Sequence, residues 1–188
     1  MKRRLYIYQE NLSEELIQLF EALSKNIKIE SVEEDMITLL DEDYYNEEPT
    51  DLEQYHILLV EDFDSMVTIF IEPYQNNPFV LGKDIKEFIK TLPHNVYHFE
   101  DLITYIVLKN NIELKEKVRD FISSKVNNEV LHTVREFIDN NMNSSKSAKK
   151  LYMHRNTLNY RIDNFIETTH INVKTFKGAN AVYMLYKF

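Results

Sequence analysis

The stretch SSKSAKKLYMHRNTLNYRIDNFI, residues 144–166, decides how the last third of this chain folds. Good helix-capping residues, Asn143 to Ser145, precede KSAKKLYM, which is compatible with a short helix. A tight connection, MHR, follows. A second helix is predicted from about Asn156, because apolar side chains recur at positions that share one helical face: Leu158, Ile162, Phe165 and Ile166. Two short helices around a tight turn are typical of a helix-turn-helix.

The first of these helices, residues 144–152, is expected to bury Ala148 and Leu151. Two helices that cross steeply come close at one point, where a large side chain would hold them apart. The small Ala148 therefore suits the crossing point, and Met153 is expected to provide an apolar plug beneath the turn. We interpret this first helix as the one that positions the motif.

The second helix, residues 156–168, carries a polar face opposite its apolar one. At about 100° per residue, this face and its flanks hold Asn156, Thr157, Asn159, Tyr160, Arg161 and Asn164. Asn and Arg side chains can make bidentate contacts with adenine and guanine edges, while Thr and Tyr can reach a base or a phosphate. We therefore expect this helix to enter the major groove of double-stranded DNA.

Basic residues gather on the first helix and at the start of the second, where they would neutralise phosphates and fix the register on DNA. His154 lies in the turn. We expect it to support the start of the second helix, and we rank this role ahead of a contact with phosphate. The predicted DNA-binding residues are Ser145, Lys146, Lys149, His154, Arg155, Asn156, Thr157, Asn159, Tyr160, Arg161 and Asn164, with Lys150 as a further phosphate contact.

The charge of the chain is distributed unevenly along its length. The formal net charge is -9, which argues against a generally polycationic nucleic-acid binder. Residues 1–126 hold 13 basic and 26 acidic residues, whereas residues 127–188 hold 9 basic and 5 acidic ones. A contact with a polyanion is therefore expected in the last third only.

The motif A-x-x-L followed by H-R-N-T-L-x-Y-R is complete here, running from Ala148 to Arg161. Together with VREFIDNNMN before it, this segment resembles the C-terminal helix-turn-helix of the PucR/CdaR-type bacterial transcription regulators. The segment VYHFEDLITYIVL, residues 96–108, resembles more weakly the part of that family that closes a degenerate GGDEF-like domain. The family usually has Thr-Gly at the end of the recognition helix, where this chain has Thr169-His170.

The first hundred residues alternate predicted strands and helices. RLYIY is typical of a strand, and Ser13 is suited to cap an amphipathic helix whose apolar positions extend to Ile27. QYHILLV and SMVTIFIE are predicted to form two antiparallel strands joined by an acidic turn. A short helix from Asp84 to Leu92 and a strand at VYHF complete this part.

From Glu100 onward the chain is predicted to be helical, with breaks at KNN and NN and a third helix from about Asn128. The fold class is therefore α+β. We expect a small N-terminal α/β domain at residues 1–99, connecting helices at 100–126, and an all-α helix-turn-helix domain at 127–188. The resemblance implies that the first of these is a degenerate GGDEF-like domain. The carboxylate-rich segment 30–53 is interpreted as a solvated surface, or alternatively as a shield over the basic helices.

The sequence gives no reason to expect an enzyme, a cofactor or a metal site. The acidic residues Glu61, Asp62 and Asp64 of the predicted hairpin invite comparison with the metal-binding hairpin of diguanylate cyclases, but glycines are missing there. The chain has two glycines and no cysteine, and no apolar run is long enough to span a bilayer. We expect a cytoplasmic protein with no membrane association.

The function predicted from the sequence is that of a sequence-specific transcription regulator. A single helix-turn-helix reads a short half-site, so a homodimer is expected. A small-molecule effector is possible, but the sequence does not identify one. The alternative is a protein-interaction module that retains the helix-turn-helix fold without binding DNA.

Overall fold

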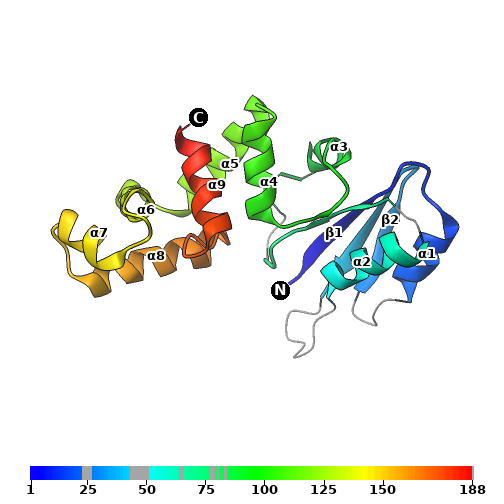
Figure 1. The fold of residues 1–188 in the computed structure, drawn as a ribbon, viewed down its shortest axis with the longest axis horizontal. Coiled ribbons are helices and arrows are strands. Elements are labelled where there is room, and N and C mark those ends of the chain that lie inside the picture. Colours follow the sequence, from blue (N-terminus) through cyan, green and yellow to red (C-terminus); the bar gives the residue numbers. More distant parts are fainter. Residues whose placement is uncertain are drawn as a thin grey trace. The chain divides into compact units, whose positions relative to one another are not determined.

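The computed structural model describes residues 1–22, 27–42, 51–63, 66–76, 79, 81–82 and 84–187, with no side-chain description for residues 62 and 63. The chain divides into two compact units, Met1–His98 and Phe99–Phe188. The first is built on a β-sheet and the second is helical (Figure 1). The predicted α+β fold class is confirmed, whereas the likeness of the first unit to a GGDEF-like domain stays a prediction.

The N-terminal unit is built on a five-stranded sheet in the order β2-β3-β1-β4-β5. Neighbouring strands are antiparallel except β4 and β5, which are parallel. The strands are β1 (Arg3–Tyr8), β2 (Ile27–Val32), β3 (Met36–Asp41), β4 (Thr68–Ile71) and β5 (Val96–Tyr97).

The two faces of the sheet are covered by different helices. Alternate side chains of a strand point to opposite faces, so Leu5 and Ile7 of β1 pack into a core with α1 (Glu14–Glu21) and α2 (Leu52–Phe63). Figure 1 shows these two helices on one side of the sheet. The short helix α3 (Asp84–Lys90) contacts β1 and β4, and its Ile85, Phe88 and Ile89 are buried.

The predicted hairpin at residues 54–72 is wrong in its first half. QYHILLV belongs to the helix α2, and only TIFI of the second run forms a strand, β4. The side chain of Asp51 explains the helix, because its Oδ1 accepts hydrogen bonds from the backbone N–H groups of Glu53 and Gln54. No metal-binding hairpin is therefore formed by these residues, and Asp64 lies outside the described residues.

One further boundary in this unit, the end of the first helix, differs from the sequence-based expectation. The first helix is capped by Ser13 as predicted, but it ends at Glu21, and Ile27 begins the strand β2. The apolar run MITLL forms β3. Of the carboxylate-rich segment, residues 43–50 lie outside the described part of the chain.

The second unit contains α4 (Phe99–Leu108), α5 (Ile112–Lys125), α6 (Asn128–Asp139), α7 (Ser144–Lys150), α8 (Arg155–Thr169) and α9 (Phe176–Lys187). Asn111, Asn127 and Asn143 each cap the following helix with a side-chain oxygen. Helix α8 packs against α5, α6 and α7, and α4 packs against α9. Leu158, Ile162 and Phe165 are fully buried, as their spacing predicts.

Within the described residues, none of the helices has both the length and the apolar character required to cross a membrane.

Candidate nucleic-acid interface

Helix α7 buries its small residues Ser147 and Ala148, and Ser147 contacts α6. Ala148 is 4% exposed, and Ser147 is fully buried. The Ser147 hydroxyl lies 2.8 Å from the Asn143 carbonyl oxygen and 3.5 Å from that of Glu136 on α6. Such close contact leaves the other face of α7 free, and Ser145, Lys146 and Lys149 lie there, exposed.

The turn between α7 and α8 presents a residue that the sequence did not single out. Tyr152 is 99% exposed and has a φ of 52°, in the left-handed region that non-glycine residues adopt at a cost. The turn is closed by a hydrogen bond of 3.0 Å from the Met153 N–H to the Ala148 carbonyl. A large aromatic side chain is therefore held outward between the two helices of the motif. Its place in a tight turn was the only signal in the sequence.

The start of α8 is built by His154, which is the N-cap residue. Its Nδ1 accepts a hydrogen bond of 3.2 Å from the backbone N–H of Asn156. This contact agrees with the supporting role expected from the sequence. Beyond it, Arg155, Asn156, Thr157 and Tyr160 are all exposed, with Tyr160 at 73%.

Arg161 lies in a different environment from Arg155. Its Nη2 is 2.8 Å from Glu129 Oε2, and its Nη1 donates to the buried Thr133 hydroxyl at 3.2 Å. Both partners belong to α6, so this guanidinium is turned toward α6. The contact fastens the middle of α8 to α6. Asn159 and Asn164 are half-buried on the flanks of the helix.

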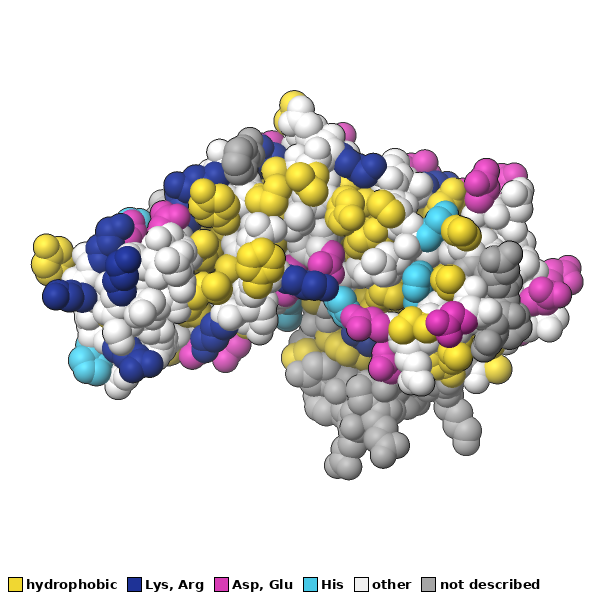
Figure 2. Space-filling model, in the orientation of Figure 1, with side chains coloured by type: hydrophobic (Ala, Val, Ile, Leu, Met, Phe, Trp, Pro, Cys, Tyr) yellow, Lys and Arg dark blue, Asp and Glu magenta, His cyan; other side chains and the backbone are white. Residues whose placement is uncertain are grey.

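One of the basic residues of α7 is also held by α6. The Nζ of Lys150 lies 2.7 Å from Glu136 Oε2, and this contact lowers the pKa of the Glu136 carboxyl. Within the part of the chain that the structure describes, Lys146, Lys149 and Arg155 form no ion pair. Figure 2 shows Lys and Arg side chains gathered at the end of the second unit where α7 and the start of α8 lie.

At the C-terminal end of α8, His170 takes the position at which PucR/CdaR-type regulators usually have glycine. The helix ends at Thr169, and His170 adopts the left-handed conformation at φ 60°. Its N–H donates to the Ile166 carbonyl and closes the last turn. Burial, with a smaller contribution from the charge of Lys125, lowers the pKa of His170.

No group of three or more His, Asp or Glu side chains arranged to hold a metal ion occurs among the described residues. The geometry of α7 and α8 instead offers one exposed surface, made of Ser145, Lys146, Lys149, Tyr152, Arg155, Asn156, Thr157 and Tyr160, which we call the α7–α8 surface. It combines cations that form no ion pair among the described residues with amide and hydroxyl groups that can donate and accept hydrogen bonds. This chemistry suits a polyanion with readable base edges.

Residues 130–187 match the family model of the PucR C-terminal helix-turn-helix domain. The resemblance stated from the sequence is thereby confirmed for this part of the chain. A 43-residue segment is 51% identical to the uncharacterized protein YxkF of Bacillus subtilis (strain 168). That match covers 23% of this chain and 14% of the relative.

The fold of the chain is similar to a solved structure, that of a regulator of polyketide synthase expression from Bifidobacterium adolescentis. The TM-score is 0.52 at 12% sequence identity, and the similarity covers 98% of this chain and 78% of the other. At this identity the likeness concerns the fold alone.

Proposed function

We propose that this chain, which carries a PucR C-terminal helix-turn-helix domain at residues 130–187, is a transcription regulator that binds specific sequences of double-stranded DNA. The observation that carries the proposal is the α7–α8 surface, where exposed cations and hydrogen-bonding side chains lie on two helices that are capped and packed from behind. A rigid support of this kind favours precise contacts with a ligand.

The first turns of α8 are proposed to enter the major groove. Asn156, Thr157 and Tyr160 are exposed there and would read base edges or adjacent phosphates. Asn159 and Asn164, half-buried on the flanks, would contribute at the edges of the groove. The N-terminal residues of a recognition helix are the ones that reach the bases in this motif.

Phosphate contacts are proposed for Lys146, Lys149 and Arg155, with Ser145 donating a hydrogen bond from the start of α7. We add Tyr152, whose ring stands outward in the turn and would lie against the sugar-phosphate backbone. Backbone strain of this kind clusters at functional sites.

We assign Arg161 a positioning role. Since its guanidinium is shared between Glu129 and Thr133, it holds α8 at a fixed angle to α6 in the DNA-free chain. His154 supports the recognition helix in a comparable way, from its N-terminus.

Two copies of the chain are proposed to bind together, because one helix-turn-helix reads only a short half-site. Half-sites would then be separated by about one helical turn of DNA. The activity proposed is binding rather than catalysis, in the cytoplasm where bacterial DNA is found.

The experiment that tests the proposal compares two charge reversals in the full-length chain. Lys146→Glu/Lys149→Glu alters the α7–α8 surface, whereas Lys109→Glu/Lys125→Glu makes the same change of charge at two exposed lysines of the same unit that lie outside that surface. Affinity for a mixed-sequence duplex is measured by fluorescence anisotropy over a range of salt concentrations.

We expect the first variant to bind more weakly, with the slope of log affinity against log salt reduced by about 2, because each phosphate contact contributes about 0.9. The matched control is expected to keep the wild-type slope. Equal losses in both variants would mean that overall charge alone drives the binding. No measurable binding by the wild type at low salt would favour the alternative of a protein-interaction module.

A further inference from the structure

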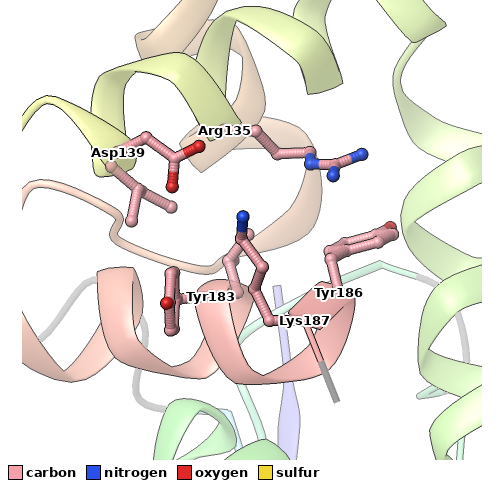
Figure 3. Close-up of a pocket in the computed structure, with 7 residues that line it drawn as sticks. Arg135, Asp139, Tyr183, Tyr186 and Lys187 are labelled. Carbon is pink, nitrogen blue, oxygen red and sulfur yellow. The ribbon is translucent and has the colours of Figure 1, made fainter.

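The N-terminal unit contains a cavity on the sheet face that carries α3. Its volume is ≈ 330 Å³, and it is lined by Arg4, Tyr6, Glu30, Ser31, Thr38, Gly82 and Lys86. This volume falls within the range of small-molecule sites, about 300–1,000 Å³. By contrast, the hollow between α6 and α9, lined by Arg135, Asp139 and Tyr186 among others (Figure 3), encloses only ≈ 10 Å³, the space of about one water molecule.

The strand register brings the polar lining residues together. Thr38 of β3 lies opposite Ser31 of β2 and also opposite Tyr6 of β1, so the three side chains form a row on one face. The pairing of β2 with β3 shifts between Ile29 and Ser31, which leaves Glu30 as an extra residue. An irregularity of this kind re-aims a side chain and is over-represented beside functional sites.

Thr38 provides an observation that points to a ligand. The residue is only 3% exposed, yet its hydroxyl oxygen has no hydrogen-bond partner among the residues that the structure describes. A buried hydroxyl without a partner is costly, and native proteins retain few of them. Because Thr38 is one of the residues that line the cavity, an oxygen atom bound there is a candidate partner for this hydroxyl.

Two cations stand at the same cavity. Arg4 uses Nε and Nη2 to bind Glu30, at 2.5 and 2.9 Å, and its Nη1 is not used in this pair. Lys86 on α3 pairs with Glu33, which does not line the cavity. The charged lining residues are therefore Arg4, Lys86 and Glu30, and each of the two cations also has a carboxylate partner.

The buried carboxyl of Glu72 contacts two residues of the cavity lining. Its Oε1 accepts from the Tyr6 hydroxyl at 2.9 Å, and its Oε2 accepts from the backbone N–H of Arg4 at 3.0 Å. Burial raises the pKa of Glu72, which favours the neutral carboxyl. The group thus orders the wall of the cavity through these two hydrogen bonds.

We propose that this cavity binds a small organic anion, whose carboxylate or phosphate group lies between Arg4 and Lys86 and whose oxygen accepts the hydrogen of the Thr38 hydroxyl. Charge-assisted contacts to Arg and Lys are the strongest hydrogen bonds available to such a group. The inference does not depend on DNA binding by the α7–α8 surface, since it concerns the residues of the other unit.

The test measures thermal unfolding of the full-length chain with inorganic phosphate, glycerol phosphate, succinate and citrate, each at millimolar concentration and against sodium chloride of equal ionic strength. Binding to the native state raises Tm in a concentration-dependent manner. We expect at least one of these anions to stabilise the wild type beyond chloride. A response to phosphate compounds alone, or to carboxylates alone, identifies the class of anion.

Lys86→Met is expected to weaken that response by more than about tenfold in apparent affinity, because it removes a charged contact. The matched control is Lys90→Met, on the same helix and paired with Asp35, but outside the cavity lining. This variant is expected to respond as the wild type does. An equal loss in both variants, or no response of the wild type beyond chloride, would overturn the proposal.

Thr38→Val separates a binding role from a packing role. The substitution keeps the shape of the side chain and removes the unpaired hydroxyl, so the ligand-free protein is expected to unfold at a higher temperature. The response to the anion is expected to weaken about tenfold, through loss of one hydrogen bond to a charged group. An unchanged anion response in Thr38→Val would remove this hydroxyl from the site and contradict the proposed geometry.

Discussion

The two ends of helix α8 differ in exposure and in the partners of their side chains. At the N-terminal end, Arg155, Asn156, Thr157 and Tyr160 are exposed, and of these only Asn156 has its backbone N–H engaged by a cap. From Arg161 onward, most side chains are half-buried or buried, and several polar groups, including those of Arg161 and Thr169, have partners within the unit. Side chains whose hydrogen-bonding groups are already satisfied contribute to stability, whereas those left exposed and unpaired are available to a partner.

This difference separates two arginines that are equivalent in the sequence motif. Arg155 and Arg161 are six residues apart on one helix, and both belong to the H-R-N-T-L-x-Y-R pattern. In the folded chain, one is exposed without an ion pair among the described residues and the other is bound by α6. Substitutions at the two positions should therefore change different measurable quantities.

The largest effect on stability is expected from Gly178→Ala. A Cβ at this position of α9 would clash with the backbone carbonyl of Asn172, in the connection that follows α8. Since backbone atoms cannot move aside cheaply, we expect a loss of about 3 kcal/mol in the free energy of unfolding of the second unit, measured by urea denaturation.

The control for this substitution is Gly82→Ala, where a Cβ would meet open space but the φ is 51°. Only the backbone strain is then expected, about 1–2 kcal/mol. If Gly178→Ala loses no more stability than Gly82→Ala, the backbone of the connection after α8 can move to accommodate a Cβ. The C-terminal end of α8 would then be less firmly packed than the structure indicates.

The next largest effect compares Arg155→Ala with Arg161→Ala. Arg155→Ala is expected to weaken DNA binding by about 1–3 kcal/mol if it contacts a base, or to reduce the salt slope by about 1 if it contacts a phosphate. Its stability should stay within about 0.5 kcal/mol of the wild type, as for an exposed residue. Arg161→Ala should lower the free energy of unfolding, because it removes the contact with Glu129. The loss should be only about 1 kcal/mol, because Glu129 is largely exposed.

The proposed difference between Arg155 and Arg161 is contradicted if Arg161→Ala reduces DNA affinity without loss of stability. In that case Arg161 would leave Glu129 and contact DNA directly. Glu129→Gln distinguishes these outcomes, since it weakens the hold on Arg161 while keeping the arginine itself. Tighter DNA binding in Glu129→Gln would indicate that the ion pair competes with DNA.

A smaller effect is expected at Tyr152. Tyr152→Gly removes an outward ring and places glycine at a φ of 52°, where it carries no steric cost. Stability should increase by about 1 kcal/mol, while DNA affinity should decrease. These opposite signs distinguish a DNA contact from a structural residue, and an affinity equal to that of the wild type would exclude Tyr152 from the interface.

The smallest effect concerns the pH dependence set by His170. Because burial lowers its pKa below the usual 6.5, the unfolded chain binds more protons than the folded chain at acidic pH. The contribution of His170 to stability is therefore complete above about pH 6.5 and is lost as the pH falls toward its folded pKa. His170→Asn, which keeps a side chain that tolerates the left-handed conformation, should remove this part of the pH dependence in urea titrations. An identical pH profile in both proteins would show that His170 is not perturbed.

The sequence predicted the helix-turn-helix well because its signals are local. Capping by Asn143, the small Ala148 and the spacing from Leu158 to Phe165 are each interpretable within one or two turns of helix. The same reasoning failed at residues 54–60, where an apolar run typical of a strand forms an exposed helix with Leu59 as a buried anchor. Whether an apolar run joins a sheet depends on the strands available to pair with it. Those strands lie elsewhere in the sequence, so the run itself does not reveal the outcome.

The partners of polar side chains were also beyond the sequence. Arg161 and Glu129 are separated by 32 positions, and their pairing depends on how α6 crosses α8. The outward orientation of Tyr152 depends on the backbone of the turn, which no residue pattern specifies. The cavity beside Thr38 is made by three strands and α3, so only the folded chain brings its lining together.

The most direct test of sequence-specific DNA binding is a selection from random duplex DNA with the full-length protein, run in parallel with Arg155→Ala and with Lys109→Ala as a matched control. We expect the wild type and the control to enrich the same inverted repeat, with half-sites about one helical turn apart, and Arg155→Ala to lose it. An absence of any enriched sequence with the wild type at low salt would contradict sequence-specific DNA binding, and recovery of the same repeat by Arg155→Ala would remove Arg155 from the interface.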